Sequence, residues 1–257
     1  AGIQADIKTI SALGGYAATA ITAITVQNTL GVQAVHPVPA ELVGEQMQAV
    51  MEDLRPDAIK IGMTGNVEII SEIARLLHQY SPRQVVLDPV MVSTSGHNLM
   101  TDEAVEAICT LLLPEVSLVT PNLHEAAVLL QQPIHTVDDM EHAAHLVYEK
   151  YHCAWLVKGG HLTGNEMCDV LYDGHELHLF GARRIHTGNL HGTGCTLSSA
   201  IATFLAQGFP LYEAVELAKT YITKAIEAGK DLHIGQGNGP LCHFPYLVNQ
   251  VNPLTEE

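Results

Sequence analysis

Residues 189–196, with the sequence NLHGTGCT, combine types that could hold an anion and move a proton. The apolar segment LSSAIATFLAQG follows at once and predicts a helix that begins near Thr193. The small residues Gly192, Thr193 and Gly194 let the backbone approach a ligand, and the first amides of a helix lie unpaired at the positive end of its dipole. The segment therefore predicts an anion hole suited to a phosphoryl group in transfer.

Cys195 would lie beside that anion. A thiol at a helix N-terminus has a lowered pKa, so the sequence predicts that Cys195 acts as a base near neutral pH. Two alternatives stay open. The loop could simply cap a core helix that buries one cysteine, or Cys195 could be a covalent nucleophile, although His191 is too close in the chain to orient it.

Apolar runs and helical patterns alternate along the chain. We expect helices at residues 3–13, 41–54, 67–80, 102–113, 125–131, 140–151, 193–207 and 211–228. We expect strands at residues 17–26 (buried), 58–62, 84–89, 117–120 and 154–158, and a hairpin in which 170–172 and 178–180 flank Asp173 and Gly174. This order predicts parallel β-α-β units with helices on both faces, in a single domain over residues 1–257.

Polar residues follow most of these strands, where α/β sheets bind ligands. Asp88 and Glu125 could hold Mg²⁺ directly or through water, and Lys158 could neutralise transferred phosphate oxygens. Each has a structural alternative: a turn at Asp88, a capping box of Asn122 with Glu125, and a solvated surface lysine.

Composition narrows the partners. The chain has 257 residues, 47% hydrophobic and 16% charged, and a formal net charge of −16. That charge argues against nucleic acid or an anionic membrane as a partner, so a phosphate ligand would need local cations. No apolar run is long enough to span a bilayer. The cysteines at 109, 153, 168, 195 and 242 are odd in number and lack paired spacing, which favours free thiols in a reducing cytoplasm.

Nucleotide-binding motifs and histidines are two further sources of chemical information in the sequence. The chain has neither a Walker A motif nor a protein-kinase H-R-D set. His142 and His145, with Glu141 beside them, could ligate a metal, but further ligands are not evident, which favours a solvated helix face. His161 and His191 are better placed to touch phosphate.

The motifs AGIQADIKT, TAITVQNT, IKIGM, VVLDPVMV, TPNLHEA, LVKGGH, HGTGCTLSSAIA and GNGPLCHF occur in this order. In these motifs the chain resembles the hydroxymethylpyrimidine/phosphomethylpyrimidine kinases of the ribokinase-like superfamily. The resemblance implies a three-layer α/β/α sandwich with a central, mostly parallel sheet, and a homodimer. It also implies ATP- and Mg²⁺-dependent phosphorylation of 4-amino-5-hydroxymethyl-2-methylpyrimidine and then of its monophosphate, in thiamine biosynthesis.

The resemblance assigns roles to residues. Cys195 stands where sugar-kinase relatives place an aspartate base. Asp6 and Gln27 would contact the polar edge of the pyrimidine, and Met63 and Val90 would line its ring. For the nucleotide, the expected contacts are Asn122, Lys158, His191 and Thr193.

This sequence departs from the family pattern at two places. The family begins with a strand and a Gly-Ser/Thr-Asp…Ser-Gly-Gly loop before AGIQAD, whereas this sequence opens at Ala1, so we expect an upstream segment. Leu190 replaces an expected threonine. A cysteine-type pyridoxal kinase is the alternative enzyme, although it would carry a different residue at Gln27 and Gly-Ala-Gly-Cys. A binding protein of kinase fold without catalysis is the non-enzymatic alternative.

Overall fold

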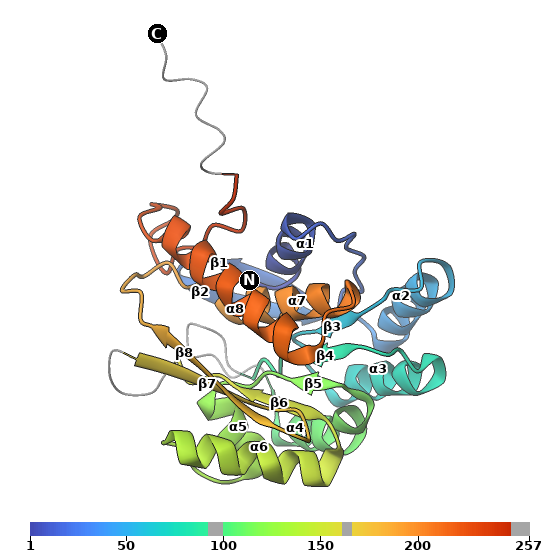
Figure 1. Cartoon of the computed structure of the whole chain (residues 1–257). Coiled ribbons are helices and arrows are strands. Elements are labelled where there is room, and N and C mark those ends of the chain that lie inside the picture. Colours follow the sequence, from blue (N-terminus) through green and yellow to red (C-terminus); the bar gives the residue numbers. More distant parts are fainter. Residues whose placement is uncertain (92–99, 161–165, 248–257) are drawn as a thin grey trace.

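A six-stranded sheet forms the centre of the molecule (Figure 1). The computed structural model describes residues 1–91, 100–160 and 166–247. The strand order follows the chain: β3 (Ile59–Ile61), β4 (Val85–Leu87), β5 (Leu118–Val119), β6 (Ala154–Val157), β7 (Glu166–Tyr172) and β8 (Leu177–Arg183). Strands β3 to β6 are parallel, and β7 and β8 form the predicted antiparallel hairpin. The expectation of a mostly parallel α/β sheet is confirmed.

Helices cover both faces of this sheet (Figure 1). Side chains alternate along a strand, so Val86 on β4 joins an apolar core with two helices, α7 (Thr193–Ala206) and α8 (Leu211–Gly229). Val85 and Leu87 face a second core with α3 (Val67–Tyr80) and α6 (Val137–Tyr151). The helices are α1 (Ile3–Ala12), α2 (Ala40–Asp53), α3 (Val67–Tyr80), α4 (Asp102–Ala107), α5 (Leu123–Leu130), α6 (Val137–Tyr151), α7 (Thr193–Ala206) and α8 (Leu211–Gly229). The two cores make the three-layer arrangement that was expected.

Two sequence expectations about elements are wrong. The buried strand at residues 17–26 is instead irregular up to Thr22 and then an exposed strand, β1 (Ala23–Asn28). Among the residues that the structure describes, strand β1 pairs with β2 (Gly31–Pro37) alone, in an antiparallel ribbon outside the main sheet. Its β-branched residues favour a strand but carry no information on which partner covers it.

The α-helix expected at residues 102–113 is also shorter than predicted. Helix α4 ends at Ala107 and continues as a π-helical turn, Ile108–Leu112, and a 3₁₀ turn, Leu113–Glu115. Pro114 lies at the start of the 3₁₀ turn, a position where its missing backbone N–H costs no helical hydrogen bond. In the described parts of the chain, no helix has both the length and the apolar character needed to cross a membrane.

Candidate active site

The carboxyl ends of the parallel strands open into one large cavity. Its volume of about 2180 Å³ exceeds the usual range of roughly 300–1,000 Å³ for a single small ligand, so it has room for more than one. Every residue that the sequence analysis assigned to the site lines it: Asp6, Gln27, Met63, Asp88, Val90, Asn122, Glu125, Lys158, His191, Gly192, Thr193, Gly194 and Cys195. The structure thus brings the predicted set together.

Helix α7 begins in this cavity. Its N-cap, Gly192, has a φ of 90°, a left-handed conformation that favours glycine, and no side chain caps the helix. The amide of Thr193 donates to the carbonyl of Leu190 at 3.2 Å, so this amide closes the loop. A Cβ on Gly194 would lie 3.5 Å from both Asp88 Oδ2 and Lys158 Nζ. The start of α7 therefore faces these two charged groups at close range.

Lys158 and Asp88 form a buried ion pair at the ends of β6 and β4. Lys158 Nζ lies 2.9 Å from Asp88 Oδ1, with 16% and 3% of the two side chains exposed. The hydroxyl of Thr120 donates to the same Oδ1 at 3.4 Å. Burial alone would raise the pKa of Asp88, but the charges of Lys158 and Lys60 lower it. A solvated surface lysine is therefore excluded for Lys158.

Glu125 both caps a helix and lines the cavity with a raised pKa. Its carboxylate accepts a hydrogen bond from the Asn122 amide at 2.8 Å, while the Asn122 side chain accepts one from the Glu125 amide at 3.0 Å. The capping-box alternative is thus confirmed. Burial raises the pKa of Glu125 to about 7, and Asp88 adds to the rise although Lys158 opposes it. The capping box places this carboxylate in the cavity that Asp88 lines.

The expected lowering of the Cys195 pKa is wrong. Burial raises it, and the negative charges of Asp88 and Asp6 raise it further, against the opposing charge of Lys60 and a hydrogen bond with the Gly2 amide. A helix N-terminus supplies only partial charge, whereas the partial burial of Cys195 and its two negative neighbours disfavour a thiolate. The sequence could not reveal this burial, because it depends on how α1 covers the start of α7.

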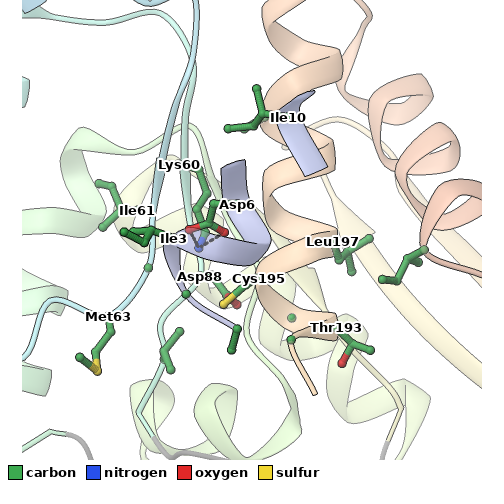
Figure 2. A pocket seen from close by; sticks show the side chains of 18 of the residues that line it. Ile3, Asp6, Ile10, Lys60, Ile61, Met63, Asp88, Thr193, Cys195 and Leu197 are labelled. Carbon is green, nitrogen blue, oxygen red and sulfur yellow. Dashed lines mark hydrogen bonds and ion pairs between the residues drawn. The ribbon is translucent and has the colours of Figure 1, made fainter. Parts of the chain in front are cut away.

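The sequence analysis missed Lys60 and Ser199, which both bind Asp6. Figure 2 shows Lys60 beside Asp6. Lys60 Nζ lies 3.0 and 3.1 Å from the two carboxylate oxygens of Asp6, and the Ser199 hydroxyl donates to Asp6 Oδ1 at 2.7 Å. Ser199 is one helical turn after Cys195, so both lie on the same side of α7. A lysine between two isoleucines in a buried strand was an available signal, since a buried charge requires a partner.

A second missed pair lies where the chain leaves β6. The amide of Gly159, next to Lys158, donates to Asp169 Oδ1 at 2.8 Å, and Lys219 donates to Asp169 Oδ2 at 2.5 Å. Asp169 is on β7 and Lys219 on α8, and both line the cavity. This pair fixes the backbone that carries Lys158.

The remaining predictions concern Met63 and the histidines at 142, 145 and 161. The Thr22 hydroxyl donates to the Met63 carbonyl at 2.6 Å, which ties the start of the β1–β2 ribbon to the cavity. His145 packs against Tyr172 with ring centroids 3.9 Å apart. Among the described residues no three His, Cys, Asp or Glu side chains are grouped to hold a metal, so the alternative at His142 and His145 finds no further ligand. His161 lies outside the described residues.

Comparison with known proteins gives concordant results. A family model described as phosphomethylpyrimidine kinase matches residues 1–242. A hydroxymethylpyrimidine/phosphomethylpyrimidine kinase of Rhizobium meliloti is 52% identical over 245 residues, covering 95% of this chain and 92% of the relative. The phosphomethylpyrimidine kinase crystal structure from Clostridium difficile superposes with a TM-score of 0.79 at 43% identity, covering 88% of this chain and 93% of that one. Pyridoxal kinase from Staphylococcus aureus, in complex with AMP-PCP and pyridoxal, has a TM-score of 0.87 at 32% identity and coverages of 96% and 89%.

Proposed function

The chain belongs to the phosphomethylpyrimidine kinase family, and we propose that it transfers the γ-phosphate of ATP to 4-amino-5-hydroxymethyl-2-methylpyrimidine and then to its monophosphate. These steps belong to thiamine biosynthesis. The observation that carries the proposal is that the Lys158–Asp88 pair, the start of α7 and Cys195 line one cavity together with Gln27. Catalysis of phosphoryl transfer is mostly positioning and electrostatics, which such a cluster can supply.

Pyrimidine binding would use the side of the cavity formed by α1, β3 and the ribbon. The Gln27 amide can both donate and accept, which suits an aminopyrimidine edge. Met63 and Val90 would contact the ring. Asp6 lines this region but already accepts hydrogen bonds from Lys60 and Ser199, so it would contact the pyrimidine as part of that charged group.

Phosphoryl transfer would occur at the start of α7. The substrate hydroxyl oxygen attacks the γ-phosphorus, a new O–P bond forms, and the bond to the β–γ bridging oxygen breaks to release ADP. Lys158 and the amides of Gly194 and Cys195 would balance the negative charge on the phosphoryl oxygens. The hydroxyl proton would pass to the Cys195 thiolate, the minor form of a thiol whose pKa burial has raised.

The nucleotide would be ATP, as the S. aureus relative bound to AMP-PCP suggests, with Asn122, His191 and Thr193 near its phosphates. The carboxylates of Asp88 and Glu125 fit a Mg²⁺ ion. Asp88 binds Lys158 through Oδ1 and keeps Oδ2 near the start of α7, and Mg²⁺ needs few protein ligands when phosphates and waters supply the others. When bound, the ion would draw charge from the transferred phosphate.

A homodimer accords with the exposed apolar side chains of the ribbon. Ile24, Val26 and Leu30 are 63%, 46% and 67% exposed, and an isolated two-stranded ribbon has little stability of its own. Light scattering after size-exclusion chromatography tests for this dimer.

The decisive experiment measures ATP consumption with the hydroxymethylpyrimidine, its monophosphate and pyridoxal in parallel. Turnover of both pyrimidines well above pyridoxal is expected. A preference for pyridoxal would favour the second candidate, a cysteine-type pyridoxal kinase, which the similarity to the S. aureus enzyme supports. Binding of the pyrimidine without turnover of any substrate would favour a non-catalytic protein.

A further inference from the structure

The β1–β2 ribbon is attached to the body of the protein at both of its ends. At its base, the Thr22 hydroxyl donates to Met63, and the Gln46 side chain bonds the backbone of Ile21 on both its amide and its carbonyl. Strand β1 itself is exposed from Ile24 to Asn28. The position of Gln27 near the ribbon tip therefore depends on what holds the tip.

Thr29, in the turn between β1 and β2, makes that attachment. Its hydroxyl oxygen accepts hydrogen bonds from the amides of Gln236 and Gly237 at 3.1 and 3.2 Å. Its carbonyl accepts a third from the Asn238 amide at 2.9 Å. A side chain on Gly237 would collide with the Thr29 carbonyl, so the close approach requires glycine there.

The segment that Thr29 binds also contacts the loop before α7. The His191 amide donates to the Gly239 carbonyl at 3.1 Å, directly before the N-cap Gly192. A side chain on Gly239 would collide with the Asn189 side chain. The side-chain amide of Asn189 lies within hydrogen-bond distance of three backbone carbonyls at and just after the end of α8, to which it donates: those of Gly229, Lys230 and Leu232. Residues 236–239 thus join the ribbon tip to the phosphate end of the cavity.

A small second pocket between these parts shows how close they are. Gln27, Thr29, His191 and Asn238 all line it, and its volume is only about 10 Å³, too small for anything beyond a single water. The ribbon tip, the segment 236–239 and the loop before α7 therefore pack directly against one another.

We propose that Thr29 is a positioning residue for the reaction: through residues 236–239 it holds Gln27 in register with the loop 189–194. The proposal rests on the proposed function, because it takes Gln27 as the pyrimidine contact. Loss of the Thr29 hydroxyl would let the ribbon tip move away from the loop. The pyrimidine would then bind more weakly, whereas the nucleotide, which does not use the ribbon, would bind as before.

The test compares Thr29→Val, which removes the hydroxyl but keeps the shape, with Thr29→Ser, which keeps the hydroxyl. Thr29→Val is expected to raise KM for the hydroxymethylpyrimidine roughly tenfold, the effect of losing two hydrogen bonds, and to change KM for ATP by less than about twofold. Thr29→Ser is expected to restore a KM near that of the native protein. An unchanged pyrimidine KM in Thr29→Val, or an equal rise in both KM values with a lower Tm, would overturn the proposal.

Hydrogen–deuterium exchange separates this proposal from the proposed function. Faster exchange at 236–237, whose amides donate to the Thr29 hydroxyl, is expected in Thr29→Val but not in Thr29→Ser, whether or not the native protein phosphorylates the pyrimidine. If the native protein fails to turn over the pyrimidine, the proposed function fails, and unchanged exchange at 236–237 would then independently overturn the link through Thr29.

Discussion

Replacing Lys158 with methionine tests the energetics of the site most directly. The substitution keeps the length and packing of the side chain but leaves the Asp88 carboxylate, 2% exposed, without its partner at 2.9 Å. Removing one member of a buried ion pair costs about 3–5 kcal/mol. Lys60 still acts on Asp88, so we expect a loss near the lower limit, about 3 kcal/mol in the free energy of unfolding.

The double variant Lys158→Met with Asp88→Asn provides the control. It removes both charges, and the amide can still accept the hydrogen bond of Thr120. We expect it to recover most of the lost stability, because no unpaired charge is left in the interior. Its turnover should be no higher than that of Lys158→Met, which we expect roughly 10²–10³-fold below the native rate, since neither variant can neutralise the transferred phosphate and the double variant also lacks the Asp88 carboxylate proposed to hold Mg²⁺.

Urea unfolding followed by circular dichroism measures the stabilities, and coupled ATP consumption measures the rates. A double variant as unstable as Lys158→Met would show that methionine disturbs packing and that the unpaired carboxylate is not the cause. Near-native turnover of Lys158→Met would refute the role of Lys158 at the phosphate.

The remaining predictions concern protons. Cys195→Ala should keep the fold and ATP binding, measured by circular dichroism and calorimetry, but lose most phosphorylation; near-normal turnover would remove the thiol from its role as base. Because the pKa of Cys195 is raised above 9.0, kcat/KM of the native protein should rise about tenfold per unit from pH 7 to 9; a flat profile would contradict this. Glu125 has a pKa of about 7, so its protonated form stabilises the fold. This contribution to the free energy of unfolding is complete below pH 4.5 and is lost as the pH rises through 7. Glu125→Gln keeps the capping box and should abolish this loss in Mg²⁺-free urea titrations. Burial, with the charge of Lys8, lowers the pKa of His243 from 6.5 to about 4. The stability that neutral His243 contributes is therefore present above pH 6.5 and is lost as the pH falls towards 4. His243→Asn should remove this acid sensitivity, and an unchanged pH dependence of the free energy of unfolding would argue against a neutral buried histidine.

The fold was predictable wherever periodicity and burial agree. Helix α3 occupies Val67–Tyr80, as its apolar spacing indicates, and Asn66 caps it through the Ile69 amide. The prediction of a buried strand at residues 17–26 is wrong because β-branched residues favour a strand equally in a core and in an exposed ribbon. Which of these occurs depends on β2, a partner that local sequence does not identify.

For the site, the sequence identified residues at strand ends and in recognisable motifs, but it missed Lys60 and Ser199. Asp88 and Lys158 were found because topology brings the ends of β4 and β6 to one edge of the sheet. Lys60 and Ser199 lie inside a strand and a helix, and their link through Asp6 joins positions as far as 193 residues apart. Such pairs depend on tertiary packing, and so does the burial that raises the pKa of Cys195.

The net charge of −16 repels an anionic substrate, so binding of a phosphate requires cations at the site itself. The structure answers with three lysines at the cavity, each paired with an aspartate: Lys60 with Asp6, Lys158 with Asp88, and Lys219 with Asp169. An unpaired buried lysine would lose its proton. Despite burial, the pKa of Lys60 is raised by the charge of Cys195 and then by those of Asp6 and Asp88, and the pKa of Lys158 is raised by those of Asp88 and Glu125. The same carboxylates offset the attraction that these cations exert on phosphate. A site built in this way needs further positive charge, which Arg183 and Arg184 at the same cavity, the start of α7 and a divalent ion can supply, so its activity should depend on Mg²⁺.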